Sequence, residues 1–583
     1  MSNDRRAALV VITVAALVML PNLGGPPLWD EDEPLNAACS LAMRKTGDWI
    51  VPTFNGTLRI DKPVLVNWVQ LAGFALAGVD ETGARLGSAV LTIGTCLLTC
   101  LIARTILRPD VGPWAGIVMA TCVWTAVAGR AATPDATLAC CTTLALWCFV
   151  RGCVGPAAGG AGWSAAPVRL SAGWAAAVGA ACGLAILAKG PVGLVLPLAA
   201  LGGFCWWQAL RDPGRVGTRT ARIVSAFGDA WRGLRPLLVI AVALAVAAPW
   251  YTLVTLRTEG EWLRGFLLVH NVGRFSAPLE GHSGPAAVYY PLVILGGTFP
   301  WSVAAALVGG TVLRTCRSAT APEAAGMRLL VAWVAAWVIP FSLSGTKLPG
   351  YVWPAYPALA AAIAFFVSDW IRKPCASTDA WMRWAWALLA TTGMAISVGL
   401  PVTLRRFAPG SEWLGIVGVL PLVGGAAAWT CQRLGTRHAA ATCWAATACG
   451  TVVMLAAVGP GTLARDGGAR RIIERLAADG DVEETSVVAF RSPPSVVFYA
   501  GRHTPRGAVT HFTRAADVAG HLARHPRAHV VATAASATKL ARHLPETHEV
   551  VGTARTQPGI DDLVIIGPSP AVVATAPPEA TRR

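Results

Sequence analysis

The chain has 583 residues, of which 54% are hydrophobic and only 14% are charged, and its mean hydropathy is +0.53. A soluble protein carries about 25% charged residues, so this composition excludes a single soluble core. The net charge of +16 does not indicate nucleic-acid binding, because the basic residues stand in short loops between apolar runs rather than on one domain.

Apolar runs of roughly 17–25 residues, the length that crosses ~30 Å of hydrocarbon, recur along most of the chain. They predict a mainly α-helical, polytopic membrane protein with about thirteen spans. These lie at about residues 7–23, 86–107, 112–129, 133–152, 170–188, 190–208, 235–256, 286–313, 327–344, 350–369, 381–401, 412–431 and 438–458. The first run follows Arg5 and Arg6 as a signal peptide would, but Pro21–Gly25 is a poor cleavage site, so we expect an uncleaved anchor.

Loop charge predicts the orientation. With a cytoplasmic N-terminus, most arginines fall in inner loops and the first outer loop, residues 24–85, is acidic. The positive-inside rule then places the C-terminal segment outside. If residues 62–79 were also a span, the arginine-rich loops that follow would no longer fall on the inner side. Asn67, Trp68 and Gln70 suit an interfacial helix better. The stretch Glu261–Val269 is also expected at the interface.

From about residue 459 the apolar runs give way to short alternating elements. We expect helices at 469–478, 517–525 and 538–544, and strands at 486–490, 529–533, 549–553 and 563–566. This pattern predicts a small extracytoplasmic α/β domain at 459–567, following a transmembrane domain at 1–458. The Pro- and Ala-rich tail at 568–583 is expected to be disordered.

Cysteine and histidine spacing does not indicate a metal site. The 15 Cys are scattered, mostly within apolar runs, without the paired spacing of zinc ligands, so we interpret them as small buried hydrophobes. His270 and His282 share a loop with Glu280, but again without metal-site spacing. Surface or interfacial roles are expected for them.

The acidic first outer loop carries four consecutive carboxylates, Asp30-Glu31-Asp32-Glu33, before Pro34. One interpretation is a solvated loop whose carboxylates cap the helix that begins near Pro34. The other is a general base, or a metal or substrate ligand, held at the membrane surface. The residue types alone leave both interpretations open.

Charged residues also gather at the predicted outer ends of the spans, where the positive-inside rule disfavours cations. They are Lys62, Arg85, Arg130, Asp135, Lys189, Arg274 and Lys347. A lysine at headgroup depth can hold a lipid phosphate, although snorkelling explains most such lysines. Arg405 and Arg406 also face outward, so outward cations alone prove little. Departure of a phosphate from a sugar needs cations, and attack by an acceptor hydroxyl needs a carboxylate base. An acidic outer loop that faces these cations at the outer ends of the spans meets both needs.

In the order of its motifs the chain resembles the aminoarabinose transferase and protein O-mannosyltransferase-like enzymes, which are GT-C membrane glycosyltransferases. The resemblance covers about residues 20–360. Its motifs are Trp29–Glu33, Gly47–Pro52, Asn55-Gly56, Asp61-Lys62-Pro63, Ala84-Arg85-Leu86, Pro134-Asp135, Lys189-Gly190, Pro249-Trp250-Tyr251, His270 with Arg274-Phe275, Gly281–Pro285, Pro300-Trp301-Ser302, Phe341–Ser344 and Lys347-Leu348-Pro349.

The resemblance implies transfer of a sugar, usually with inversion, from a polyprenyl-phosphate donor to a lipid, glycan or protein acceptor. The reaction would take place on the outer face of a bacterial-type inner membrane, as in lipid A or other cell-envelope glycan modification or in protein glycosylation. The implied catalytic residues are Asp32 and Asp135, and the implied phosphate ligands are Lys62 and Arg274. Asp30, Glu33, Asp61, Arg85, Arg130, Lys189, Lys347 and Tyr351 would line the site, and Asp61 is a candidate ligand for a divalent metal.

Two features depart from the family pattern. Arg59-Ile60 stands where aromatic residues are usual, and the run of carboxylates leaves Asp30 as an alternative to Asp32. The main alternative function is a transporter or flippase of a lipid-linked sugar, which needs the same cations. Such a protein should show repeat symmetry or broken helices with midplane charges, and the sequence shows neither. A surface-glycan polymerase or ligase differs only in donor size and acceptor.

Overall fold

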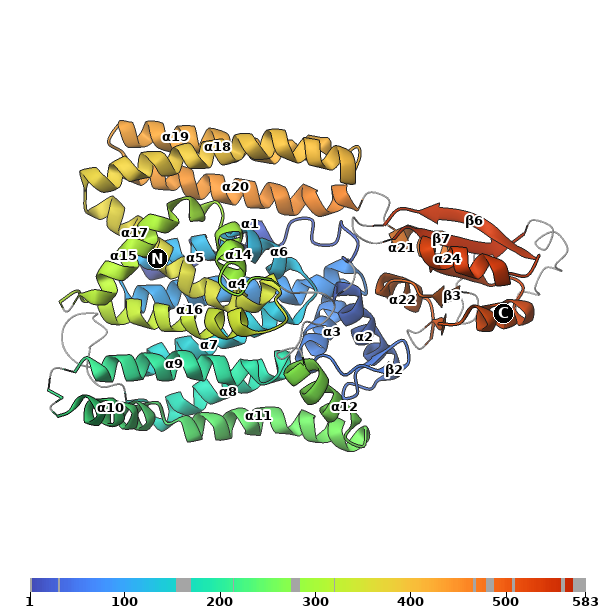
Figure 1. The fold of residues 1–583 in the computed structure, drawn as a ribbon, viewed down its shortest axis with the longest axis horizontal. Helices are drawn as coiled ribbons and strands as arrows, with labels where there is room; N and C mark the ends of the chain where they lie inside the picture. Colours follow the sequence, from blue (N-terminus) through green and yellow to red (C-terminus); the bar gives the residue numbers. More distant parts are fainter. Residues whose placement is uncertain are drawn as a thin grey trace. The chain divides into compact units, whose positions relative to one another are not determined.

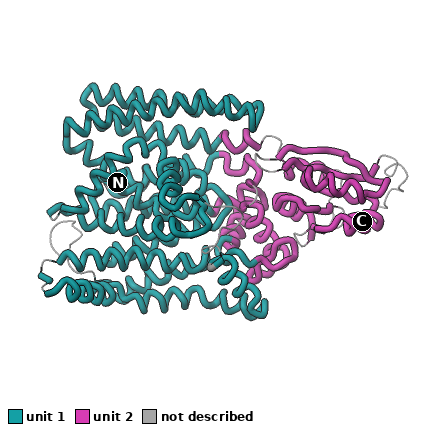
Figure 2. The backbone as a smooth tube through the Cα atoms, viewed as in Figure 1, with its two compact units in different colours: residues 1–21, 60–66, 88–457 teal, residues 22–59, 67–87, 458–583 magenta. Residues whose placement is uncertain are grey.

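The computed structural model describes residues 3–29, 32–153, 169–212, 214–215, 217–273, 284–318, 320–464, 468–478, 487–505, 509–556 and 561–569. The chain divides into two compact units (Figure 2): residues 1–21, 60–66 and 88–457 form unit 1, and residues 22–59, 67–87 and 458–583 form unit 2. Unit 2 thus joins most of the first outer loop to the C-terminal segment. Since unit 2 combines outer-loop residues with the C-terminal segment, it does not correspond to a continuous domain, and the predicted domain bounds at 458 and 567 remain a prediction.

Unit 1 is a helical bundle (Figure 1). Its helices are α1 (Asn3–Met19), α4 (Glu81–Ile106, whose first turns belong to unit 2), α5 (Val111–Thr121), α6 (Val123–Arg130), α7 (Pro134–Cys153), α8 (Ala172–Lys189), α9 (Val192–Leu210), α10 (Arg219–Leu234), α11 (Pro236–Arg257), α12 (Glu261–Arg264) with the π-helical η1 (Gly265–Gly273), α14 (Tyr289–Gly297), η2 (Trp301–Ala304), α15 (Ala305–Arg317), α16 (Ala324–Leu343), η3 (Pro349–Ala355), α17 (Tyr356–Arg372), α18 (Ala376–Phe407), η4 (Glu412–Gly418), α19 (Val419–Arg433) and α20 (Arg437–Leu463).

Ten helices in the described ranges are long and apolar enough to cross a membrane, and two bent pairs raise this number to twelve if each is one span. The pairs are α5 with α6, bent by 65°, and α14 with η2–α15, bent by 115°. The first predicted span coincides with α1, which is only 17 residues long. Each predicted span therefore coincides with a helix or a bent pair, and the polytopic α-helical fold is confirmed, although the count of thirteen is not.

The two stretches that were expected at the interface are short in the structure. Residues 62–79 contain α3 (Leu65–Ala77), whose 13 residues span about 20 Å, too little to cross the hydrocarbon. Residues 261–269 form α12 and most of η1. The structure therefore agrees with excluding both from the list of spans.

The outer-loop part of unit 2 starts with α2 (Asp32–Thr46) and a hairpin of β1 (Thr53–Phe54) and β2 (Thr57–Leu58). Both turn residues have positive φ, Asn55 at 50° and Gly56 at 79°, as a type I′ turn requires.

The C-terminal part of unit 2 is a five-stranded sheet in the order β4-β3-β5-β7-β6, with helices between strands. Its elements are α21 (Gly468–Ala478), β3 (Val487–Phe490), α22 (Pro494–Gly501), β4 (Thr510–Phe512), α23 (Ala515–Arg524), β5 (His529–Thr533), α24 (Ala534–Leu540), η5 (Ala541–His543), β6 (His548–Ala554) and β7 (Leu563–Pro568). β3, β4 and β5 are parallel, and β7 and β6 continue the sheet antiparallel.

The predicted small α/β domain is thus confirmed, with α22 and β4 as additional elements. Position 486 of the predicted first strand, and residues 570–583 of the predicted tail, lie outside the described residues.

Within unit 2, α2 packs against α22. The Lys45 ammonium donates hydrogen bonds to the carbonyls of Gly501 (2.7 Å), Arg502 (2.9 Å) and Thr504, at and just beyond the C-terminal end of α22. On the hairpin, the Asn55 side chain accepts a hydrogen bond from the Val509 amide at 2.8 Å. The C-terminal domain is therefore fastened to the outer loop through specific polar contacts.

Candidate active site

Asp135, Lys189 and Tyr351 come from three separate elements and meet in unit 1. Asp135 lies in the first turn of α7 and Lys189 is the last residue of α8, and their side chains form an ion pair. The Lys189 ammonium also lies 5.2 Å from the centre of the Tyr351 ring. Both charged side chains are partly exposed, at 16% for Lys189 and 22% for Asp135. This cluster is therefore accessible to a ligand.

The backbone around this cluster requires glycine at two positions. Gly190 ends α8 with φ of 87°, and a Cβ there would lie 2.5 Å from the Phe266 ring. A Cβ on Gly350 would lie 3.0 Å from a carboxylate oxygen of Asp135. Glycine thus sets the direction of Lys189 and lets the loop before η3 approach Asp135.

Lys347 lies in the loop that leads into η3. It is 7% exposed, and its ammonium donates a hydrogen bond to the Ser344 carbonyl at 2.6 Å. The hydroxyls of Tyr289 and Tyr290 donate to the carbonyls of Lys347 (3.4 Å) and Leu348 (3.5 Å). Residues 344–351 are thus held in place from α14. The two tyrosines were not among the predicted site residues, because they lie outside the motifs.

An apolar groove of about 540 Å³ runs along α8, α9 and α11 in unit 1. Its volume falls in the range of small-molecule sites. The lining includes Ile186 and Pro191, which flank Lys189 and Gly190 in sequence, and Tyr251, whose hydroxyl lies 3.5 Å from the Ile186 carbonyl. The other lining residues are Leu194, Val195, Leu244, Ala247, Ala248, Thr252, Thr255, Leu256, Leu263 and Leu267. This apolar groove thus extends to Ile186 and Pro191, close in sequence to Lys189 at the C-terminal end of α8.

Asp61 and Lys62 also belong to unit 1. They lie in the segment 60–66, both partly buried, just before α3. Ile60 packs against η1, because a Cβ on Gly265 would lie 2.6 Å from its side chain. This packing fixes the backbone that carries Lys62. Arg274, which follows η1, and Asp30 lie outside the described residues, so their predicted roles remain predictions.

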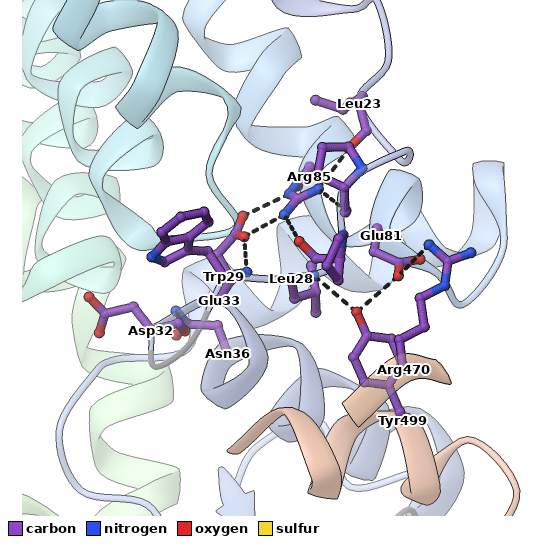
Figure 3. Close-up of polar contacts among 12 residues, drawn as sticks. Leu23, Leu28, Trp29, Asp32, Glu33, Asn36, Glu81, Arg85, Arg470 and Tyr499 are labelled. Carbon is purple, nitrogen blue, oxygen red and sulfur yellow. Dashed lines mark hydrogen bonds and ion pairs between the residues drawn. The ribbon is translucent and has the colours of Figure 1, made fainter. Parts of the chain in front are cut away.

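In unit 2, Glu33 and Arg85 form a buried, two-pronged ion pair (Figure 3). The Arg85 Nε and Nη2 atoms lie 2.8 and 2.6 Å from the two Glu33 oxygens, and the side chains are only 8% and 6% exposed. Arg85 also donates to the carbonyls of Leu23 (2.9 Å), Pro26 (2.8 Å) and Pro27 (2.8 Å). These contacts hold the backbone before the carboxylate run. They favour a structural role for Arg85 and Glu33.

Asp32 differs from Glu33 in its surroundings. It is the first residue of α2, its side chain is exposed, and it points away from Arg85 in Figure 3. The Asp32 carbonyl accepts a hydrogen bond from the Asn36 side chain at 2.8 Å. Of the described carboxylates in the run, Asp32 is therefore the one exposed to a ligand.

Arg130, another predicted cation of the site, ends α6 in unit 1. Its guanidinium donates hydrogen bonds to the carbonyls of Val18 (3.0 Å), Met19 (2.9 Å) and Pro21 (2.7 Å). These carbonyls follow or end α1, where helix acceptors need partners. The contacts favour a capping role for Arg130.

Tyr499 of α22 makes contacts with the outer loop that the sequence did not predict. Its hydroxyl accepts a hydrogen bond from the Leu28 amide at 2.9 Å and donates one to the Glu81 carboxylate at 2.9 Å (Figure 3). Burial raises the pKa of Tyr499 well above its usual value, and Glu81 raises it further. The phenol therefore stays protonated, as donation to Glu81 requires. Arg470 completes the network at 3.1 Å from Glu81.

Within the described ranges, no group of three or more His, Cys, Asp or Glu side chains is arranged to hold a metal ion. The metal role of Asp61 stays a prediction.

The fold defines the class of this chain, a polytopic α-helical membrane protein with a small α/β domain. A family model described as dolichyl-phosphate-mannose-protein mannosyltransferase matches residues 8–256. Among curated proteins, the undecaprenyl phosphate-alpha-4-amino-4-deoxy-L-arabinose arabinosyl transferase of Erwinia tasmaniensis is 28% identical over 360 residues, covering 62% of this chain and 59% of that protein. A Pseudomonas fluorescens enzyme of the same name, numbered 2, is 27% identical over 78% of this chain and 75% of its own length.

Among solved structures, ArnT from Cupriavidus metallidurans bound to undecaprenyl phosphate superposes with a TM-score of 0.74 at 22% identity, covering 97% of this chain and 98% of that one. The same protein in its apo state gives 0.71. The chain thus has the ArnT fold, and the predicted resemblance to aminoarabinose transferases and protein O-mannosyltransferases is confirmed. The chain spans about three fifths of the length of the first curated relative.

Proposed function

We propose that the protein is a glycosyltransferase that moves a sugar from a polyprenyl-phosphate carrier to an acceptor at the outer membrane face. The observation that carries this proposal is the meeting of Asp135, Lys189 and Tyr351, three predicted site residues from distant parts of the chain, in unit 1. An apolar groove reaches the same end of α8. A cation binds a phosphate and an apolar groove takes a long hydrocarbon tail, so these two features together suit a polyprenyl phosphate.

The cations would act on the leaving group. As the acceptor oxygen attacks the anomeric carbon, the bond from that carbon to the phosphate oxygen breaks, and the polyprenyl phosphate leaves with an added negative charge. A positioned lysine stabilises that charge as it develops. Lys62 and Arg274 are proposed for this role from the motifs, and Lys189 from its position beside the groove. Asp135 would keep the Lys189 ammonium oriented.

The carboxylate that takes the acceptor proton is proposed to be Asp32. This assignment is supported by the motif and by the contrast between exposed Asp32 and buried Glu33. If the acceptor is a hydroxyl, Asp32 removes its proton during attack, and single displacement inverts the anomeric centre. If the acceptor is a phosphate, Asp32 orients it instead.

The donor is proposed to be an undecaprenyl-phosphate sugar, because the curated relatives and the structural neighbour carry that carrier in their names. The acceptor is left at the level of a lipid, glycan or protein. The orientation is proposed from loop charge, with the N-terminus cytoplasmic and the C-terminal domain outside.

Purified protein in proteoliposomes, given radiolabelled undecaprenyl-phosphate sugars and an envelope extract, tests the proposal. Label should move to an extracted acceptor, and Lys189→Ala should reduce the rate about a hundredfold. Arg405→Gln, an exposed cation at the end of α18, serves as the matched control and should leave transfer unchanged. Movement of the carrier across the bilayer without sugar transfer would instead establish the flippase alternative.

A further inference from the structure

Helix α10 has an apolar face that is exposed in the structure. Ile223, Val224, Phe227 and Trp231 are 38%, 65%, 58% and 46% exposed. At 100° per residue these four lie within one arc of the helix, and the Phe227 and Trp231 rings contact each other with centroids 6.1 Å apart. Four large apolar side chains on one face mark an interaction surface.

The position of α10 places this face at a membrane boundary. α10 follows α9 and precedes α11, two helices long enough to cross a membrane. Arg235 has a left-handed φ of 53°, and Pro236 begins α11, so the chain turns sharply between α10 and that span. The junction of α10 with α11 is therefore where a membrane face would lie.

The contacts of α10 with α9 fall on a short stretch of α9. The Trp206 indole donates to the Ile223 carbonyl at 3.4 Å, and a Cβ on Gly202 would lie 4.0 Å from Leu234. Ile223 and Leu234 are about 16 Å apart along α10, whereas Trp206 and Gly202 are about 6 Å apart along α9. α10 therefore packs on the last turns of α9, and this 16-residue helix is not among the helices long and apolar enough to be another span.

Charge identifies the lipid. Arg219, Arg222, Arg232 and Arg235 are all exposed on α10 or at its end. The carboxylate on this helix, Asp229, is paired with Arg215 at 2.6 Å and lies 3.8 Å from Arg232, so it offsets little of the charge of the four exposed arginines. A basic helix with an aromatic apolar face matches a surface of anionic headgroups over acyl chains.

We propose that α10 is an anionic-phospholipid binding element that lies in the plane of the interface. Phe227 and Trp231 insert at headgroup depth, and the exposed arginines bind lipid phosphates. This inference is independent of the proposed sugar transfer.

Amide hydrogen exchange of residues 217–235 in the full-length protein tests it, with nanodiscs of phosphatidylcholine alone or of phosphatidylcholine mixed with phosphatidylglycerol. Exchange should be about tenfold slower in the anionic discs at low salt, and high salt should remove most of the difference. R222Q/R232Q should abolish the difference, whereas R222K/R232K should keep it. R405Q/R406Q, a pair of exposed arginines at the end of α18, is the matched control and should also keep it.

Equal protection in both discs, unaffected by removal of the arginines, would overturn the proposal. Protection that is lost in Phe227→Gln but is equal in both discs would show apolar insertion without selection for anionic lipid, which also contradicts it. Exchange of α20 amides in the same samples shows whether a variant is folded.

Discussion

Adjacent carboxylates in this protein have opposite surroundings, and this contrast gives the clearest prediction at the scale of single residues. Asp32→Asn removes an exposed group, so transfer should fall about 10²- to 10⁴-fold while the melting temperature stays unchanged. Glu33→Gln leaves the buried Arg85 guanidinium without its counter-charge, and the free energy of unfolding should fall by about 3–5 kcal/mol. Thermal unfolding and transfer rates of the detergent-solubilised variants check both. A Glu33→Gln protein of native stability would show that the pair is not what holds the loop.

The Asp135–Lys189 pair allows activity to be separated from stability. Each single neutralisation, Asp135→Asn or Lys189→Met, removes this ion pair from a partly buried setting and should lower stability. The double variant removes both charges and should regain part of that stability, because a paired charge costs desolvation. Its transfer activity should stay as low as that of Lys189→Met alone. Activity that recovers together with stability would mean that the pair is only structural.

The sequence predicted Asp135, Lys189 and Tyr351 as site residues from their motifs, and the structure brings these three residues together. It did not separate Glu33, Arg85 and Arg130 from them. Whether an arginine binds a ligand or a set of carbonyls depends on partners far along the chain, and Arg130 finds its partners 109 to 112 residues away.

At the scale of elements, Tyr499→Phe tests how α22 fastens the outer loop. The substitution removes one hydroxyl and leaves the Leu28 amide and Glu81 without that partner, so stability should fall by about 1–3 kcal/mol. Hydrogen exchange of residues 22–29 should accelerate more than that of β5. Phe498→Leu, a change in the neighbouring buried apolar side chain of α22, is the comparison, because it alters packing and removes no hydrogen bond. Equal acceleration in both variants would mean that packing, not the hydroxyl, holds the loop.

The buried His548 is expected to make the C-terminal sheet sensitive to acid. Burial lowers the pKa of His548. The hydrogen bond between the His548 ring and the Ala528 carbonyl opposes this shift, and the neighbouring His529 adds to it. Because the folded-state pKa lies below the unfolded value of about 6.5, the stabilising contribution is complete above that pH and is lost as the pH falls. Exchange of β5 and β7 amides, corrected for intrinsic rates, should therefore show less protection at about pH 5 than at about pH 7.5. His548→Gln should narrow the gap, and an unchanged gap would assign the effect to other groups.

Some elements could not be found in the sequence. The break between α5 and α6 falls at Cys122, whose backbone is extended, with neither Pro nor Gly at the break. The Val123 amide that this break frees donates to the Phe299 carbonyl at 3.2 Å, a partner that local pattern cannot supply. The short β4 and the eight-residue α22 contain too few repeats of the hydrophobic pattern to be predicted from the sequence.

At the scale of the whole molecule, the grouping of the C-terminal domain with the outer loop was also beyond the sequence. The contact of Leu28 with Tyr499 joins residues 471 positions apart, and no local signal predicts such a pairing. The sequence did predict the helical membrane bundle and the terminal α/β domain, because hydropathy and strand periodicity are local properties.

The most direct test of the account is single-turnover transfer in proteoliposomes from radiolabelled undecaprenyl-phosphate sugar, comparing wild type with Lys62→Ala, Asp32→Asn and the control Arg405→Gln. We expect labelled acceptor with wild type and control, and loss of transfer in the other two variants while insertion and melting temperature are retained. Undiminished transfer in Lys62→Ala and Asp32→Asn would contradict the assigned roles, and carrier movement without any transfer would contradict the glycosyltransferase function itself.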